Sequence, residues 1–391
     1  MSLTDKSRRI FSAVGIFAAA TLALAGCTTA ATETSSGGSS SSSSSSSDSS
    51  STPVSKDDIV LVASVINTTN PYMASNIAGA EALARELDLP LEIIDSEGSS
   101  QTQNSKIQAI LAQGKTVVMF VNTVSSSDAP IIVEAVKDAG GYVSIWWNKP
   151  DDYEPWDVGN NFVAFQKHPG VPSGQCTAER LAEAIGEEGA IIALPGVQDS
   201  TTSQTRVAGL EDALTAYPNV TLLEKRPSNW DPELAYQNAQ DLIVKYGDEI
   251  KGVWTADDAM QIGAMKAFED AGLLDQVKFV SDGLYPPTIE DMRSGRGNNA
   301  IVGETFHRGY MASAIGLYTA YLAATGEINP AELPNEKRNS LFDIACVTPE
   351  NLEEYTVFDD DIDGWIDQLI ANGPWDTQPV PLIGGGPEIL P

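Results

Sequence analysis

The sequence predicts an α/β protein with two lobes, each a doubly wound parallel sheet covered by helices. Two observations support this prediction. Short apolar, β-rich runs alternate with helical patterns from Ile59 onward, and this alternation is typical of parallel sheets covered on both faces. The alternation breaks at 166–173 and then restarts. The pattern therefore indicates two units of roughly 100 residues each.

The first unit is expected to hold strands separated by amphipathic helices. In its first helical pattern, Ile77, Ala80, Leu83 and Leu87 recur at helical spacing. The expected strands are Ile59–Val65, Leu91–Asp95, Val117–Val121 and Tyr142–Trp147. The expected helices are Tyr72–Leu87, Gln101–Gln113 and Asp128–Ala139.

The second unit repeats the alternation. Its expected strands are Ala190–Leu194, Val220–Lys225, Gly252–Thr255 and Lys278–Ser281. Its expected helices are Gln175–Glu187, Ser203–Tyr217, Pro232–Tyr246 and Ala259–Ala271. Ligands of doubly wound folds bind beyond the carboxyl ends of the strands. Two facing lobes therefore predict a binding site in the cleft between them.

The composition excludes several classes of function. The 391 residues include 54 acidic and 23 basic side chains, a formal net charge of −31, whereas nucleic-acid binding needs a basic surplus. Three cysteines and two histidines leave little for a zinc site. We expect no metal, no cofactor and no nucleic-acid partner. A single apolar run approaches membrane length, so a polytopic membrane protein is not expected.

That apolar run lies at the N-terminus and has the form of an export signal. Lys6, Arg8 and Arg9 precede an almost wholly apolar stretch at 10–25, which ends in Leu-Ala-Gly-Cys at Cys27. This ending resembles a bacterial lipobox, in which the cysteine thiol takes a diacylglycerol before cleavage. The alternative is an uncleaved signal anchor with a chance cysteine. We expect a signal peptide at 1–26 and lipidation of Cys27.

A serine tract follows the predicted lipidation site. Between 35 and 51, 14 of 17 residues are serine, and such tracts behave as flexible coil. Residues 27–56 are therefore expected to tether a folded body to the membrane. Two acyl chains on one cysteine can hold a protein on a membrane without a spanning helix. The expected location is the outer face of the cytoplasmic membrane, outside the cell interior.

Four segments resemble those of the ribose-type periplasmic sugar-binding proteins. The first strand and loop at 62–73 match, as do the Arg-x-x-Gly start at 206–210, the Asp-Asp signature with its small-residue helix at 253–268, and the Asp-Gly strand end at 279–283. The likeness runs from about Ile59 to Thr348, in the family's order. It implies a periplasmic binding protein of type I, a monomer whose lobes are joined by a hinge of three segments.

The resemblance also implies lobe boundaries. The N-terminal lobe would comprise 57–165 and 306–341, and the C-terminal lobe 166–305 and 342–391. The crossings would lie near 165–169, 304–307 and 342–347. The acidic segment after Thr348 is expected to pack on the C-terminal lobe.

Ligand contacts follow from the resemblance position by position. In the first lobe the matching residues are Asn70, Tyr72, Met73, Asn122, Trp147 and Asn148. In the second lobe they are Arg206, Trp230, Asp257, Asp282 and Glu304. Carboxylates, amides and arginine bond sugar hydroxyls in fixed directions, and aromatic rings stack on apolar C–H faces.

The sequence indicates a ligand other than ribose. Ribose binders carry Asp-Arg where this chain has Trp147 and Asn148, so a charged clamp is replaced by a flat surface. A neutral monosaccharide, a polyol or a cyclitol is expected. A ligand with an amine also suits the excess of acids over Arg206, whereas an anionic ligand does not.

Structural roles compete with the proposed contacts. We expect Asp258 to be a helix N-cap, with Asp257 as the alternative cap. Trp146 and Trp147 are neighbours on an expected strand, so they face opposite ways and one of them belongs to the core. Tyr72 could be a packing residue.

Arg206 has a competing explanation of its own. It could pair with Glu211 or Asp212 on its own helix. Glu304 falls where a hinge glutamine is common in the family.

The expected function is capture of a monosaccharide or polyol for delivery to an ABC permease. A sensor that presents the ligand to a membrane receptor is the alternative. An enzyme is disfavoured, because no Gly-x-x-x-x-Gly-Lys-Ser/Thr run and no Gly-x-Ser-x-Gly elbow occur, and His168 and His307 have no nucleophile partner in sequence; no catalytic residue is expected. A sugar-sensing repressor would need a helix-turn-helix where this chain has the signal.

Two further sequence features remain. Cys176 and Cys346 would lie where disulfides persist, so they either form a disulfide or remain two buried free thiols. The acidic run at 359–363 lacks the glycine and terminal glutamate of an EF-hand, so no metal is expected there.

Overall fold

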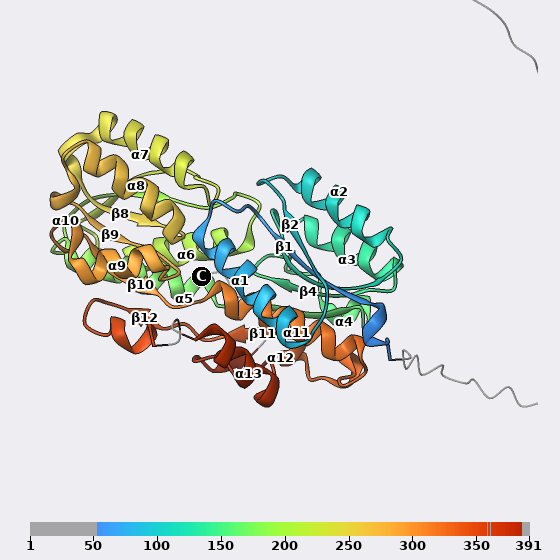
Figure 1. The fold of residues 1–391 in the computed structure, drawn as a ribbon. Coiled ribbons are helices and arrows are strands. Elements are labelled where there is room, and N and C mark those ends of the chain that lie inside the picture. Colours follow the sequence, from blue (N-terminus) through green and yellow to red (C-terminus); the bar gives the residue numbers. More distant parts are fainter. Residues whose placement is uncertain (1–52, 358, 360, 385–391) are drawn as a thin grey trace, which may run out of the picture. The chain divides into compact units, whose positions relative to one another are not determined.

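The computed structural model describes residues 53–357, 359 and 361–384 (Figure 1). The predicted signal peptide, Cys27 and the serine tract at 35–51 lie outside these residues. Within the described ranges, no helix is long and apolar enough to cross a membrane.

Two sheets organise the folded part of the chain. The seven-stranded sheet has the order β13-β11-β5-β4-β3-β1-β2, and the six-stranded sheet has the order β12-β10-β9-β8-β6-β7. We call the parts built on these sheets the first and second lobes. The strands are β1 (Ile59–Val65), β2 (Leu91–Asp95), β3 (Thr116–Asn122), β4 (Tyr142–Trp146), β5 (Phe162–Lys167), β6 (Gly189–Leu194), β7 (Val220–Lys225), β8 (Ile250–Thr255), β9 (Lys278–Val280), β10 (Ile301–Thr305), β11 (Asn339–Phe342), β12 (Cys346–Val347) and β13 (Leu382–Gly384).

Helices cover both sheets (Figure 1). They are α1 (Pro71–Glu86), α2 (Ser100–Leu111), α3 (Asp128–Asp138), α4 (Pro155–Val158), α5 (Gly170–Ala184), α6 (Thr201–Leu214), α7 (Pro232–Tyr246), α8 (Asp258–Asp270), α9 (Pro286–Ser294), α10 (Arg296–Asn299), α11 (Gly309–Ala324), α12 (Asn335–Arg338) and α13 (Ile362–Asn372). Short 3-10 turns lie at Lys56–Asp58, Gly247–Glu249, Leu274–Gln276, Pro330–Glu332 and Leu352–Tyr355.

The predicted α/β class with two parallel-sheet lobes is confirmed. Strand β1, which lies between β3 and β2, is buried along its whole length, as a parallel strand covered on both faces must be. Its neighbours β2 and β3 both run parallel to it. The antiparallel partners among the described strands are the edge strands, β13 against β11 and β12 against β10.

The chain passes between the lobes four times, the last time after β12, when it returns to the first lobe with α13 and β13. It leaves β5 of the first sheet and enters α5, which packs on the second sheet. It returns after β10 to α11, which packs on the first sheet, and it leaves β11 for β12. His168 Nδ1 lies 2.8 Å from the carbonyl oxygen of Asp343, so the first and third crossings are bonded to each other.

The expected position of the C-terminal segment is wrong for its last part. Strand β13 pairs with β11 of the first sheet, and α13 packs against α1 and α11. Trp365 of α13 packs edge-on against Tyr310, with ring centroids 5.4 Å apart. Residues just after Thr348 do contact the second lobe, since Arg293 bonds Glu353. The chain therefore runs back across to the first lobe, where an apolar helix face and a free sheet edge accept it.

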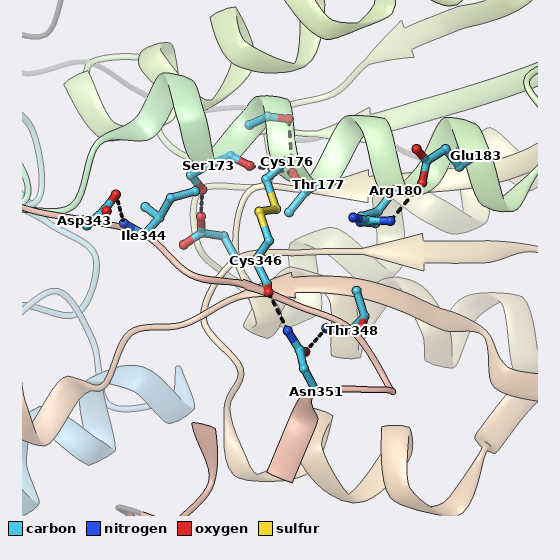
Figure 2. The surroundings of a disulfide bond; sticks show 12 residues. Ser173, Cys176, Thr177, Arg180, Glu183, Asp343, Ile344, Cys346, Thr348 and Asn351 are labelled. Atoms are coloured by element: carbon cyan, nitrogen blue, oxygen red, sulfur yellow. Dashed lines mark hydrogen bonds and ion pairs between the residues drawn. A yellow bond between two sulfur atoms is a disulfide. The ribbon is translucent and has the colours of Figure 1, made fainter. Parts of the chain in front are cut away.

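A disulfide joins Cys176 to Cys346 (Figure 2). Cys176 lies in α5 and Cys346 begins β12, 170 residues later, with the two Cα atoms 6.2 Å apart. The bond fastens the end of the third crossing to the first helix of the second lobe. Cys346 is exposed, whereas Cys176 is buried.

Candidate ligand-binding site

A cavity lies between the lobes at the carboxyl ends of the strands. About 340 Å³ of space within it is free of protein atoms, including space that is open to solvent. Every predicted contact residue lines it except Asp282 and Glu304. The lining residues are Ile66, Asn70, Tyr72, Met73, Asn122, Trp147, Asn148, Thr202, Arg206, Trp230, Asp257, Tyr285 and His307.

Asn70 is the N-cap of α1 and also reaches the opposite lobe. Its Oδ1 accepts from the backbone N–H of Tyr72 at 2.8 Å, which is the usual use of an asparagine at this position. Pro71 then occupies the first helical turn, where its fixed φ is favourable. The Asn70 Nδ2 is left to donate to Asp257 Oδ2 at 2.8 Å. The cap thereby fixes a polar side chain at the cavity wall.

Trp146 and Trp147 separate at the end of β4. The strand ends at Trp146, one residue earlier than expected, and Trp146 stacks on Phe342 in the core with centroids 5.9 Å apart. Trp147 adopts a φ of 78°, a left-handed conformation that costs a non-glycine residue about 1–3 kcal/mol and is concentrated at functional sites. Its Nε1 donates to the Tyr72 hydroxyl at 2.8 Å. The two rings form one aromatic wall of the cavity.

Asp257, and not Asp258, is the N-cap of α8. Its Oδ1 accepts from the Met260 N–H at 3.0 Å, so the expectation that favoured Asp258 is wrong. The carboxylate of Asp258 instead accepts from the backbone N–H of Tyr285 at 2.6 Å. Asp258 supports the loop before α9, which leaves the preceding residue to begin the helix.

Trp230 is held against Gly196 on the second-lobe side. A Cβ at Gly196 would lie 2.1 Å from the Trp230 ring, so only glycine leaves room for the indole. Trp230 also has a positive φ, 62°. The sequence contains no local signal for this fit, because the two residues lie in different loops.

Arg206 lines the cavity, and Asp282 lies behind it. Arg206 Nη2 is 2.5 Å from Asp282 Oδ1, and His307 Nε2 is 2.6 Å from the same oxygen. Ser173 donates to the other oxygen, Oδ2. Asp282 was expected to touch ligand, but its carboxylate is occupied by these three groups. The alternative pairing of Arg206 on its own helix is not found.

Glu304 also lies away from the cavity wall. It is fully buried and its Oε1 accepts from Gln261 Nε2 at 2.8 Å. Burial raises the pKa of Glu304, and the adjacent carboxyl of Asp258 raises it further. Two buried acids in contact are stable only when they share a proton. Glu304 was expected to contact the ligand, but the structure places it away from the ligand cavity.

The lining of the cavity is close to electrically neutral. Burial tends to raise the pKa of Asp282, but Arg206 and His307 outweigh it and hold that pKa below its ordinary value. Burial raises the pKa of Asp257 to about 7, against the bonds from Met260 and Asn70 that lower it. Burial lowers the pKa of His307 as well. At neutral pH the site thus has an internal ion pair, a neutral imidazole and a partly protonated acid.

Tyr285 and His307 were missed as lining residues. Tyr285 stacks on Tyr72 with ring centroids 5.6 Å apart, and His307 meets Tyr72 edge-on at 4.9 Å. Both follow the carboxyl ends of strands of the second sheet, β9 and β10. Their position after strand ends is the sequence feature from which both lining residues could have been predicted.

Several buried polar atoms of the lining residues have no hydrogen-bond partner within the described residues. They are Asn122 Oδ1, Arg206 Nε, Trp230 Nε1 and His307 Nδ1. Because His307 Nε2 bonds the Asp282 carboxylate, Nε2 carries the proton of the neutral ring and Nδ1 is an acceptor. Buried polar groups are normally satisfied, so the wall offers both donors and acceptors to a guest molecule.

The fold and this polar and aromatic cavity between the lobes define a two-lobed solute-binding protein. A family model described as the periplasmic binding protein domain matches residues 61–327. The chain belongs to this family. The expectation of an extracytoplasmic binding protein, as opposed to an enzyme, is thereby confirmed.

Two solved structures have a fold similar to that of this chain. A structure named as a twin-arginine translocation pathway signal protein from Burkholderia phytofirmans has a TM-score of 0.75 and 30% identity, and the match covers 83% of this chain and 98% of that one. A solute-binding protein from Bacillus halodurans with bound myo-inositol has a TM-score of 0.64, 23% identity and coverage of 76% and 97%; at that identity it shows the fold alone.

Curated relatives are more distant in sequence. The xylitol-binding protein of Mycolicibacterium smegmatis is 21% identical over 76% of this chain and 80% of its own length. The ribose import binding protein of Salmonella typhimurium is 25% identical over 59% of this chain and 74% of its own length.

Proposed function

We propose that this protein captures a neutral, polyhydroxylated small molecule in the cavity between its lobes and delivers it to an ABC permease. A monosaccharide, a polyol or a cyclitol is the class of ligand that fits. The relatives are named for ligands of this class, xylitol and ribose, and one structural neighbour holds myo-inositol.

The unpartnered polar atoms of the wall are the observation that carries the proposal. Asn122 Oδ1 and His307 Nδ1 are acceptors, and Arg206 Nε and Trp230 Nε1 are donors. A hydroxyl group donates one hydrogen bond and accepts others. A ring or chain bearing several hydroxyls can therefore satisfy both kinds of atom at once.

The aromatic residues and the charge balance support the same ligand class. Tyr72, Trp147 and Trp230 present flat surfaces that fit the apolar C–H faces of such molecules. The charge of Arg206 is already balanced by Asp282, which disfavours an anionic ligand. Asp257 is partly protonated near neutral pH, which weakens the case for an amine.

A thermal-shift screen tests this proposal. The panel contains ribose, other pentoses, hexoses, xylitol and other pentitols, myo-inositol, and one amino sugar and one sugar phosphate as charged controls. A ligand that binds only the folded state raises the melting temperature. We expect at least one neutral member to do so. A shift confined to the charged controls, with none from the neutral members, would overturn the proposal.

We further propose that Cys27 carries the lipid anchor and that the protein acts as a monomer at the outer face of the cytoplasmic membrane. The signal pattern and the serine tract support this arrangement. Cys27→Ala should leave the leader uncleaved or release the protein from membranes. Wild-type protein that incorporates no labelled fatty acid, or that elutes as a dimer, would contradict the corresponding part.

A further inference from the structure

Two consecutive residues of the first lobe dock on the N-terminus of α6 in the second lobe. Asn148 Oδ1 accepts from Ser200 Oγ at 2.8 Å and from the Thr202 N–H at 3.1 Å. The Trp147 carbonyl accepts from Thr202 Oγ1 at 3.0 Å. All of these bonds join one lobe directly to the other, with no ligand between them.

The first lobe holds this pair in place through its own backbone. The Trp147 N–H donates to the Gln166 carbonyl at 3.0 Å, and the Asn148 N–H donates to the Trp146 carbonyl at 3.1 Å. Thr123 Oγ1 donates to the Asn148 carbonyl at 3.0 Å. The left-handed φ of Trp147 is thus secured by bonds that do not involve the second lobe. The acceptor groups are presented whether or not the lobes meet.

The second lobe contributes donors that a helix normally leaves unsatisfied. The first N–H groups of an α-helix have no partner within the helix, and the Thr202 N–H is one of them. Ser200 caps a different group, the Ser203 N–H, at 3.1 Å. Asn148 therefore completes the capping of a helix in the other lobe, which it can do only while the lobes are together.

We propose that Asn148 is a closure residue: it strengthens ligand binding by stabilising the closed arrangement of the lobes, and its amide oxygen is committed to α6. The inference rests on the proposed function only in placing the ligand between the lobes. Its consequence for the free protein is independent of any ligand. A bond made only in the closed state raises the population of that state, and the affinity of a ligand that needs closure rises with that population.

The test compares variants that separate the acceptor role of Asn148 from its donor role. Asn148→Asp keeps an oxygen acceptor for Ser200 and Thr202, and it removes the amide donors that a ligand could use. Asn148→Leu has a similar volume and removes both. Thr202→Val breaks one bond of the same contact from the opposite lobe. Ser127→Ala is the control, because Ser127 Oγ donates to Asp199 across the lobes at an exposed position.

The first readout is the radius of gyration of the ligand-free protein by small-angle scattering. We expect Asn148→Leu and Thr202→Val to expand the protein, and Asn148→Asp and Ser127→Ala to leave it near the wild-type value. The second readout is the Kd for xylitol, ribose or myo-inositol, whichever shifts the melting temperature. We expect about tenfold weaker binding for Asn148→Leu and a smaller loss for Asn148→Asp, which keeps the contact with α6 and has lost only the amide donors.

Two results would overturn the inference. One is an Asn148→Leu protein as compact as wild type without ligand. The other is an Asn148→Asp protein that stays compact without ligand yet binds as weakly as Asn148→Leu, which would assign Asn148 to ligand contact. If Asn148→Leu expands and no neutral ligand of the thermal-shift screen raises the melting temperature, the closure role of Asn148 is upheld and the proposed ligand class is contradicted.

Discussion

Asn70 and Asp257 meet across the cleft, with the Asn70 Nδ2 donating to Asp257 Oδ2 at 2.8 Å. Each residue is also the N-cap of a helix in its own lobe, α1 for Asn70 and α8 for Asp257. The two capped helices therefore point their N-termini at a shared polar contact. The carboxyl group of Asp257 is buried because the lobes lie together, and this makes its protonation sensitive to closure.

The ligand-free protein should expand as the pH rises from 5 to 8. The pKa of Asp257 is raised to about 7 by burial, above its ordinary value, so the closed form binds a proton that the open form releases. Ionisation at higher pH consequently favours the open form, and the free energy of unfolding falls across the same interval. Arg206 and Asp258 act on this group in opposite directions, and Tyr285 lies near it.

Small-angle scattering at both pH values checks this expectation. The control is Asp257→Asn, which keeps a capping oxygen and cannot ionise. Its radius of gyration should not change with pH. Equal expansion of the wild type and Asp257→Asn would show that another group is responsible.

Arg206→Ala should abolish ligand binding and destabilise the fold by about 3–5 kcal/mol. The variant leaves the Asp282 carboxylate buried without its cation, which is the costly way to break a buried ion pair. Urea unfolding of Arg206→Ala and of the double variant Arg206→Ala/Asp282→Asn checks this reason. The double variant should recover part of the stability and still fail to bind. A double variant no more stable than Arg206→Ala would argue against the ion pair as the cause.

Gly196→Ala should weaken ligand binding by displacing Trp230. The added Cβ would lie 2.1 Å from the indole ring, and overpacking of this kind costs about 1–3 kcal/mol. Calorimetry and thermal unfolding measure the two effects. The same substitution in a Trp230→Ala background should be almost neutral, because the ring is gone. Persistence of the full penalty in that background would place the clash elsewhere.

Loss of the disulfide should cost about 2–4 kcal/mol of stability. The bond closes a segment of 170 residues, which constrains the unfolded chain. The expected loss appears in urea unfolding of Cys176→Ser/Cys346→Ser and in the wild type treated with reductant, since Cys346 is exposed. Reductant should not change the double variant. Wild-type protein that shows no free energy difference upon complete reduction would contradict this expectation.

Glu304→Gln should make the stability less sensitive to alkaline pH. Burial raises the pKa of both Glu304 and Asp258, and Asp258 raises that of Glu304 further, whereas the bond from Glu304 lowers that of Asp258. The folded state therefore holds a proton that the unfolded state releases. Stability is therefore lost as the pH rises through the folded-state value. An amide can donate to Asp258 at any pH. Melting temperatures between pH 6 and 9 should fall less for Glu304→Gln than for the wild type.

The control for this comparison is Glu249→Gln, an exposed position in the turn before β8. It should show the wild-type dependence on pH. If Glu304→Gln follows the same curve as Glu249→Gln, the shared proton has no effect on stability.

Part of the site could be predicted because it follows from strand ends. Asn122 is the last residue of β3, and Asp257 comes two residues after β8. Parallel strands place their carboxyl ends at one edge of the sheet, so a correct reading of the alternation locates these side chains. Asp282 also follows a strand, β9, yet it does not line the cavity, because its carboxylate bonds Arg206 and His307 instead. The local sequence pattern does not distinguish a strand-end residue that lines the cavity from one that bonds residues behind the cavity wall.

The sequence alone determined the α/β class and the two parallel-sheet lobes. These depend on hydrophobic periodicity, which each segment carries by itself. Only the tertiary structure decided that Asn148 meets α6, that Gly196 makes room for Trp230 and that β13 returns to the first sheet. Each of these depends on a contact between segments far apart in the chain. The energy of such a contact exists only once both segments are in place, so neither segment carries a signal of it.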